Sequence, residues 1–166
     1  PKKNTERTLV AYSKYLERSA IKRKLLMADL DHQYLNDIIE RNHIENIRQN
    51  IVMPGYIVNC DLPFVYSGAF AFLYTSLRES FGIPLLEAMA CGTPVVSVDV
   101  GDVREIMGDT DGCYIAERNP DDIADKIRIA LAFKGKTQGR QRIIDLGLSN
   151  ESKIGRARVG KECRSR

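Results

Sequence analysis

Short apolar runs alternate with amphipathic segments along this 166-residue chain, and this alternation restricts the possible folds more than any other feature. We expect strands at residues 25–28, 51–53, 70–74, 94–98 and 113–116. We expect helices at residues 5–18, 33–42, 61–67, 84–91 and 120–131, with shorter helical segments at 103–107 and around 143–146. Strands that alternate with helices build a parallel sheet, because each helix returns the chain to the start of the next strand. The pattern therefore predicts an α/β fold, with a parallel sheet and helices on both faces.

The chain shows no internal repeat and no linker, but its charge is uneven. Residues 134–166 hold ten basic and three acidic residues, whereas residues 1–133 hold 15 basic and 19 acidic ones. A basic tail can meet nucleic acid or an anionic membrane surface. Residues 134–166 contain no aromatic residue that could stack on bases, so we expect no nucleic-acid partner. We interpret residues 134–166 as a helical basic tail of the domain formed by residues 1–133, and peripheral membrane contact stays open.

The amino-terminal end is unusual for such a fold. Residues 1–4 lead directly into a helix, whereas a βα domain of this kind normally has a strand before its first helix. Either the fold starts with a helix, or a first strand precedes Pro1 in a longer protein. We favour the second interpretation.

Several classes of protein are disfavoured by composition. No apolar run approaches the roughly 20 residues that span a bilayer. The four cysteines have no CxxC spacing, and the two histidines lie eleven positions apart without an HExxH context. Metal sites normally show such spacings, so we expect no metal and reduced cysteines in a cytoplasmic protein.

The segment from residue 79 to residue 96 carries the strongest chemical signal. Glu79 and Glu87 enclose a small turn that ends at Gly82, and Pro84 marks the start of a helix. A helix N-terminus presents unpaired N–H groups and a partial positive charge. Gly82 allows a ligand to approach the backbone closely, so the N–H groups of Gly82 and Ile83 can face a diphosphate.

The two acids have different positions relative to that turn. Glu87 falls one turn into the helix, where a carboxylate can accept hydrogen bonds from ribose hydroxyls. Glu79 follows a predicted strand, at the edge where open α/β sheets bind ligands. The residues alone leave simpler alternatives open. Glu87 can be a solvent-facing residue of an amphipathic helix, and Glu79 can be a partner of the helix dipole.

Residues 79–96 resemble the E-x7-E signature of retaining glycosyltransferases with the GT-B fold, in the large fourth family of these enzymes. The likeness extends over residues 1–133. It includes 1–4 (a loop with a phosphate-binding Lys), 54–57 (a strand exit near the base), 61–69 (a short helix), Gly101 with Glu105 (a G-x-x-x-E segment) and 120–124 (a helix start).

The resemblance implies a Rossmann-like domain that forms the C-terminal, donor-binding half of a GT-B fold. It implies that Glu79 is catalytic and contacts the donor sugar, and that Glu87 binds ribose. Lys3, Gly82 and Ile83 are implied to bind the diphosphate. Phe81 lies in the same turn and Ile57 near the base, and both are counted as donor-binding. No metal or other cofactor is implied besides the nucleotide-sugar donor.

The implied reaction moves a hexose from a nucleoside diphosphate sugar to a hydroxyl, with retention of configuration. The acceptor, a glycan or a lipid-linked sugar, is expected on an N-terminal domain, so residues 1–166 alone are expected to be inactive. The family suggests polysaccharide synthesis in the cytoplasm, at the inner face of the membrane. The main alternative is a nucleotide-binding or partner-docking module without catalysis. A GT-B phosphorylase or a sugar-nucleotide epimerase fits less well, because those enzymes usually lack the E-x7-E block.

The sequence also departs from the family pattern. Residues 29–31 (Asp-Leu-Asp) stand where the family often has a Gly-rich turn, and Arg104 stands where it usually has Pro. The family's first strand, with a Gly-Arg pair, would precede Pro1. The likeness is poor from residue 134 onward.

Overall fold

The computed structural model of the chain describes residues 4–78 and 82–148. In chain order the elements are α1 (Thr5–Arg18), β1 (Leu25–Leu26), α2 (His32–Asn42), the 3-10 helix η1 (Glu45–Asn50), β2 (Ile51–Val52), α3 (Leu62–Gly68), β3 (Phe72–Tyr74), α4 (Ile83–Ala90), β4 (Val95–Val98), α5 (Val103–Met107), β5 (Cys113–Ala116), α6 (Pro120–Ala132) and α7 (Gly139–Asp145). Helices and strands alternate as the apolar pattern predicts, and the main difference is that β1, β2 and β3 are shorter than expected.

Two local expectations need correction. The 3-10 helix η1 lies in a stretch for which we expected no element. Aspartate is a common N-cap residue and Asp61 directly precedes α3, but its side chain makes no capping hydrogen bond. The backbone carbonyl of Asp61 instead accepts from the amides of Phe64 and Val65, at 3.0 and 3.1 Å. The helix therefore starts from backbone geometry, with Pro63 in its first turn.

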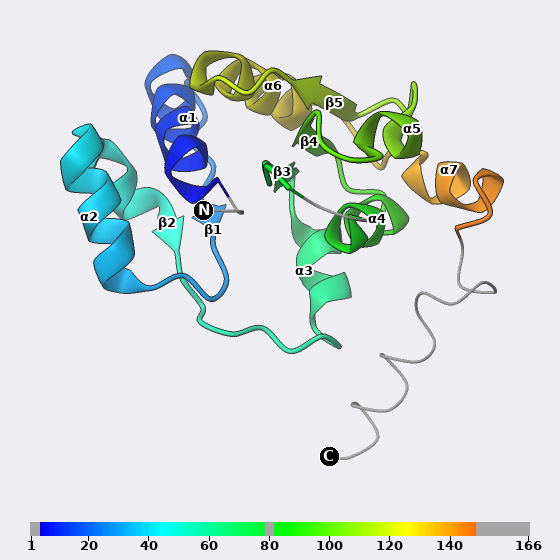
Figure 1. Cartoon of the computed structure of the whole chain (residues 1–166), viewed down its shortest axis with the longest axis horizontal. Helices are drawn as coiled ribbons and strands as arrows, with labels where there is room; N and C mark the ends of the chain where they lie inside the picture. The colour runs from blue at the N-terminus through cyan, green and yellow to red at the C-terminus, as the bar shows by residue number, and fades with distance from the viewer. Residues whose placement is uncertain (1–3, 79–81, 149–166) are drawn as a thin grey trace.

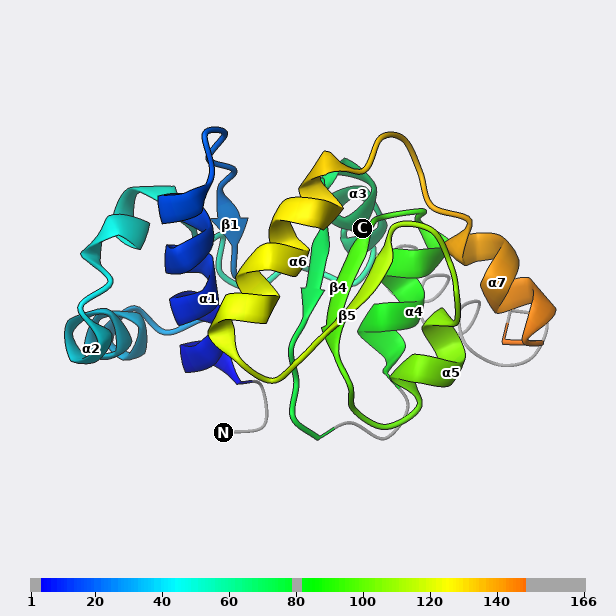
Figure 2. The ribbon, with the colours of Figure 1, turned by 90° about the horizontal axis from the view of Figure 1, so that it is seen from above.

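The strands form two parallel sheets rather than one. β1 pairs with β2, with Leu25 opposite Ile51. β4 lies between β3 and β5, with Val95 opposite both Phe72 and Cys113. Within residues 4–78 and 82–148 no strand joins β1 to β3, and the two sheets lie beside one another in Figures 1 and 2.

The larger sheet is covered on both sides. α6 and α4 lie on opposite sides of β3–β4–β5 in Figure 1, and both contact β4. All four residues of β4 are buried, and its three valines have no exposed surface. A parallel strand covered by helices on both faces reads as a continuous apolar run, as residues 95–98 do.

Helix α1 contacts both sheets. The Tyr12 hydroxyl lies 2.7 Å from the carbonyl oxygen of Arg23 and 3.1 Å from that of Asn50, just before β1 and β2. In its first turn, the Thr8 Oγ1 lies 2.6 Å from the Oγ1 of Thr75, just after β3. Along its length α1 packs against α6, which covers β4 and β5. The helix thus spans the interval between the sheets.

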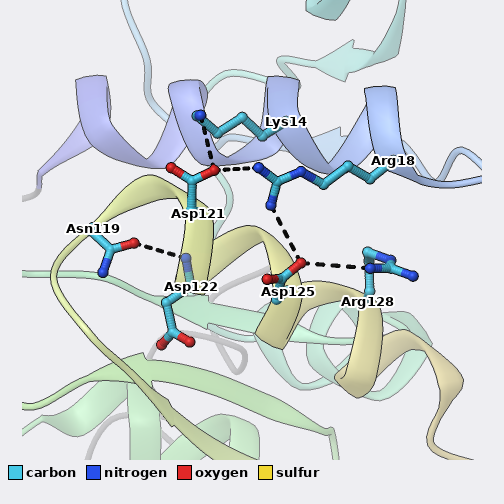
Figure 3. A network of polar contacts seen from close by, with 7 residues as sticks. All are labelled: Lys14, Arg18, Asn119, Asp121, Asp122, Asp125 and Arg128. Carbon is cyan, nitrogen blue, oxygen red and sulfur yellow. Dashed lines mark hydrogen bonds and ion pairs between the residues drawn. The ribbon is translucent and has the colours of Figure 1, made fainter.

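Charged side chains line the exposed edge of the α1–α6 contact (Figure 3). Asp121 of α6 accepts from Lys14 at 3.0 Å and from Arg18. Hydrogen bonds from Lys14 and then Arg18 hold the pKa of Asp121 below its ordinary value. Arg18 also pairs with Asp125, at 3.4 Å. These side chains are a third to a half exposed, and such pairs contribute little individually.

Replacing Tyr12 by Phe tests the α1–β1 contact through its pH dependence. Burial, with a smaller contribution from Tyr15, raises the pKa of Tyr12 from 10.0 to about 12. Between those values the unfolded chain loses the phenol proton while the folded chain keeps it, so the free energy of unfolding falls as the pH rises. Tyr12→Phe should lower stability at pH 8 by about 0.5–1.5 kcal/mol. It should also make the decline between pH 10 and 12 shallower.

The measurement is urea unfolding at a series of pH values. Tyr56→Phe is the control, because Tyr56 is 72% exposed. An equal alkaline decline in wild type and Tyr12→Phe would contradict this account of Tyr12.

Candidate functional site

The carboxyl end of β3 is where the described chain brings its candidate residues together. The strand ends at Tyr74, and the buried Thr75 follows it. The Thr8–Thr75 contact places the first turn of α1 at this end. The loop after Thr75 leads toward α4, whose first turn carries Gly82 and Ile83. In open α/β sheets, ligands bind in the crevice at the carboxyl ends of strands.

Gly82 sets the start of α4. It has φ +66° and ψ 41°, the left-handed conformation that glycine adopts without strain. Its carbonyl accepts from the Leu86 amide at 3.1 Å, which closes the first helical turn. A Cβ on Gly82 would lie 3.3 Å from the Tyr74 hydroxyl oxygen. The helix therefore begins in close contact with β3, at the edge where a ligand would approach.

Glu87 does not point freely into solvent. The residue is half-buried on α4, and its Oε2 lies 3.2 Å from the hydroxyl of Tyr66, which donates to it from α3. Burial raises the pKa of Tyr66 and the charge of Glu87 raises it further, so the phenol keeps its proton at neutral pH. The simpler interpretation, a solvent-facing acid on an amphipathic helix, does not describe this geometry.

Tyr66 is itself fixed in place. It is 8% exposed, and its backbone carbonyl accepts from the hydroxyl of Thr93 at 2.7 Å. The Phe72 ring meets its ring edge-on, with 5.3 Å between centroids and an interplanar angle of 88°. Tyr66 therefore reaches Glu87 from a position fixed on two sides, by Thr93, two residues before β4, and by Phe72 of β3.

The loops after β1 and β2 meet at the same edge. The Asp29 amide donates to the Gly55 carbonyl at 3.0 Å, and Ile57 follows two residues later, half-buried. Asp29 has φ +53°, so it takes the left-handed conformation at the position where the family often has glycine. Asp29 thus takes a backbone conformation that glycine favours, and it adds a carboxylate at this position.

The expected site residues divide into two groups. Gly82 and Ile83 lie at the start of α4, beside the end of β3, and Glu87 lies one turn further along this helix. Ile57 lies in the loop after β2. Lys3, Glu79 and Phe81 fall outside the described residues.

Sequence reasoning missed two contacts and one hollow. The Tyr66–Glu87 and Thr8–Thr75 contacts join residues far apart in sequence, so no local pattern predicts them. A tyrosine in the short helix expected at residues 61–67 was the one local sign of the first contact. An open hollow also lies at the ends of β4 and β5, where Arg104 donates to Asp99 at 2.9 Å and Arg118 donates to the Asp99 carbonyl at 2.5 Å.

Comparison with known proteins identifies the family. Residues 1–145 match the family described as glycosyl transferases group 1. The chain belongs to this family. It is 34% identical over 112 residues to the O-antigen chain mannosyltransferase B of Escherichia coli, which covers 66% of this chain and 29% of that relative. The family match extends beyond residue 133 and includes α7.

Solved structures of this group share the fold. Sucrose-phosphate synthase from Thermosynechococcus elongatus superposes with a TM-score of 0.72 over 87% of this chain and 38% of its own, at 23% identity. The Anabaena protein Alr3699/HepE, in complex with UDP and glucose, superposes with a TM-score of 0.67 over 82% of this chain and 39% of its own, at 18% identity. The expected α/β fold, a Rossmann-like half of a GT-B glycosyltransferase, is confirmed. None of the helices in the described residues combines the length and hydropathy that a membrane crossing requires.

Replacing Gly82 by Ala tests the tight start of α4. Alanine at a left-handed position costs about 1–2 kcal/mol, and its Cβ would meet the Tyr74 hydroxyl. Gly68→Ala is the matched control, because Gly68 ends α3 with open space around it. Urea unfolding should show Gly82→Ala destabilised and Gly68→Ala unchanged or slightly stabilised. Equal stabilities of the two variants would mean that the conformation at Gly82 is not required.

Proposed function

We propose that this chain is the donor-binding half of a retaining hexosyltransferase that uses a nucleoside diphosphate sugar. One observation carries the proposal: α4 begins at Gly82 beside the end of β3, and Tyr66 holds Glu87 one turn further along the helix, in a chain of the glycosyl transferases group 1 family. The UDP and glucose bound to the Anabaena structural neighbour support a nucleotide and a sugar as the ligand class.

The roles follow from the chemistry of each group. The N–H groups at the start of α4 favour an anion, so Gly82 and Ile83 hold the diphosphate, with Lys3 adding positive charge. Glu87 accepts hydrogen bonds from the ribose hydroxyls. Phe81, which directly precedes Gly82 in the sequence, is also assigned to donor binding, and Ile57 is assigned to the side of the base. With a helix end and a lysine supplying positive charge, the proposal includes no metal and no further cofactor.

The transfer step builds charge in two places. Negative charge grows on the leaving diphosphate, and positive charge grows on the sugar as its bond to the donor breaks. Lys3 and the start of α4 stabilise the diphosphate. Glu79 orients the sugar and stabilises its oxocarbenium-like character. The acceptor oxygen then forms the new bond to the anomeric carbon and gives its proton to the departing diphosphate, and the anomeric configuration is retained.

The acceptor is assigned to a part of the enzyme beyond this domain. The chain spans 29% of the length of the E. coli relative, so an acceptor-binding domain accompanies it in the proposed enzyme. That relative's name, an O-antigen chain mannosyltransferase, supports a glycan or lipid-linked sugar as acceptor. We place the reaction in the cytoplasm at the inner membrane face.

Substitution of the two glutamates in the full-length protein tests the proposal. Glu79→Ala should lower the transfer rate by about 100-fold or more while nucleotide binding is kept. Glu87→Ala should weaken nucleotide binding by about tenfold or more. Glu40→Ala on α2 is the control, because Glu40 is an exposed acid on another element.

Radiolabelled sugar transfer and calorimetric titration with UDP, GDP and ADP are the measurements. Unchanged transfer in Glu79→Ala would contradict the catalytic role of Glu79. A wild-type protein that binds a nucleotide but transfers no sugar would favour a binding module instead.

We also propose what fills the interval between the two sheets. We expect a parallel strand, provided by chain that precedes Pro1, to lie between β1 and β3 and to complete one sheet. A strand there followed by α1 and then β1 forms a βαβ unit, which links parallel strands through a helix. Leu26 on β1, which is 43% exposed, would gain a neighbour on its own face of the sheet.

The backbone shows which amides would pair with such a strand. The Met27 amide donates to Val52 at 2.9 Å, and the Phe72 amide donates to Pro94 at 2.7 Å. Successive residues of a strand point their amides to opposite edges. The amides of Leu26 and Leu73 are therefore directed into the interval between β1 and β3.

Hydrogen exchange on an extended chain tests the strand. A Val- and Ile-rich segment fused before Pro1 should slow exchange at Leu26 and Leu73, because central parallel strands have this composition. Met27 and Phe72 should be protected with or without it. The same segment with a central Pro, which cannot complete the ladder, is the control.

If the fusion does not fold, the same Val- and Ile-rich segment is instead added as a free peptide to the chain without the fusion. The proposal would be contradicted if Leu26 and Leu73 exchange freely while Met27 and Phe72 are protected, both in the fusion and with the free peptide. It would also be contradicted if Leu26 and Leu73 are protected without any added segment.

A further inference from the structure

The Tyr66–Glu87 contact joins two helices at the candidate donor site. Tyr66 donates from α3 to a carboxylate on α4, across 21 positions of sequence and 3.2 Å of space. The phenol is almost fully buried, while the carboxyl group is half-buried. The Tyr66 hydroxyl thus contacts the second acid of the E-x7-E block.

A carboxylate on a free side chain samples several rotamers, and fixing it on binding costs conformational entropy. A hydrogen bond from a buried donor restricts those rotamers before the ligand arrives. The donor here cannot easily move, because Thr93 holds its backbone and Phe72 packs against its ring. A carboxylate also has about four acceptor positions, so a bond from Tyr66 leaves others for a ligand.

We infer that Tyr66 is a positioning residue that orients the Glu87 carboxylate for the two hydroxyl groups of a ribose. This inference rests on the proposed function, in which Glu87 binds that ribose. Tyr66 touches neither the nucleotide nor the sugar in this account. Its effect on the ligand passes through Glu87 alone.

A competing role for Tyr66 is purely structural. Its ring and backbone hold α3 against α4 and against Thr93, and loss of this packing would disturb the binding of all ligands alike. The two roles differ in one respect. Positioning of Glu87 affects only ligands that carry the ribose hydroxyls, whereas a structural defect affects ligands with and without them.

The experiment compares each of UDP, GDP and ADP with its 2′,3′-dideoxy counterpart by calorimetric titration. Wild type, Tyr66→Phe, Glu87→Gln and the double variant are measured. We expect Tyr66→Phe to weaken binding of the ribonucleotide by about three- to tenfold and to leave the dideoxynucleotide unaffected. We expect no further loss when Tyr66→Phe is added to Glu87→Gln.

Tyr15→Phe is the matched control for loss of a buried hydroxyl. Tyr15 is 2% exposed, and its hydroxyl donates to the Ile21 carbonyl at 2.8 Å, far in the chain from α3 and α4. This variant should lose stability without changing the ratio of ribonucleotide to dideoxynucleotide affinity.

A measurement without ligand tests the contact itself. Replacing Glu87 by Gln removes the charged acceptor beside the phenol, so the NMR signals of the labelled Tyr66 ring should shift at neutral pH. Unchanged ring signals in Glu87→Gln would show that the two groups do not interact and would overturn the inference even where no nucleotide binds.

The binding results separate two kinds of failure. Equal losses for ribo- and dideoxynucleotides in Tyr66→Phe, with a selective loss in Glu87→Gln, would overturn the role of Tyr66 and leave the proposed function intact. Equal losses in Glu87→Gln would remove the ribose assignment, and the inference about Tyr66 would fall with it.

Discussion

The packing of α1 across two separate sheets is the contact on which the rest of the structure depends. The described strands do not connect β1 to β3, so helices must hold the two sheets in register. α1 reaches the start of β1 through Tyr12 and the end of β3 through Thr8. At the same end as the Tyr12 contact, before β1 and β3, the Arg23 guanidinium lies 3.8 Å above the Phe70 ring centroid. The two sheets are therefore linked at both ends of the facing strands.

Apolar burial, rather than charge, must provide most of the stability of this joint. Leu9 and Leu16 on α1, and Ile123 and Ile127 on α6, are at most 3% exposed. Truncating one such side chain to alanine typically costs about 2–5 kcal/mol, whereas an exposed ion pair contributes about 0–1 kcal/mol. The network around Asp121 and Arg18 in Figure 3 is thus better suited to fixing the relative rotation of the two helices than to holding them together.

The sequence predicted local structure well and distant contacts poorly, for one physical reason. Periodicity reports which face of a segment is buried, so α1, β5 and the start of α6 were predicted at their observed bounds. Strand length depends also on partners, and β1 and β3 each have one described partner and are shorter than predicted. The Tyr66–Glu87 contact depends on how α3 packs on α4, which no local pattern encodes.

The same packing sets the spacing within the candidate site. Gly82 and Glu87 both belong to the α4 segment, and a rise of 1.5 Å per residue separates them by roughly 7.5 Å along the helix axis. In the proposed function, an anion at the start of α4 and a hydroxyl pair at Glu87 must therefore match a fixed span. Tyr66 adds a second restraint from α3, which removes the remaining freedom of the carboxylate. Selectivity for a ligand with both groups can then arise from helix geometry, because a ligand that carries only one of them satisfies only one end of the span.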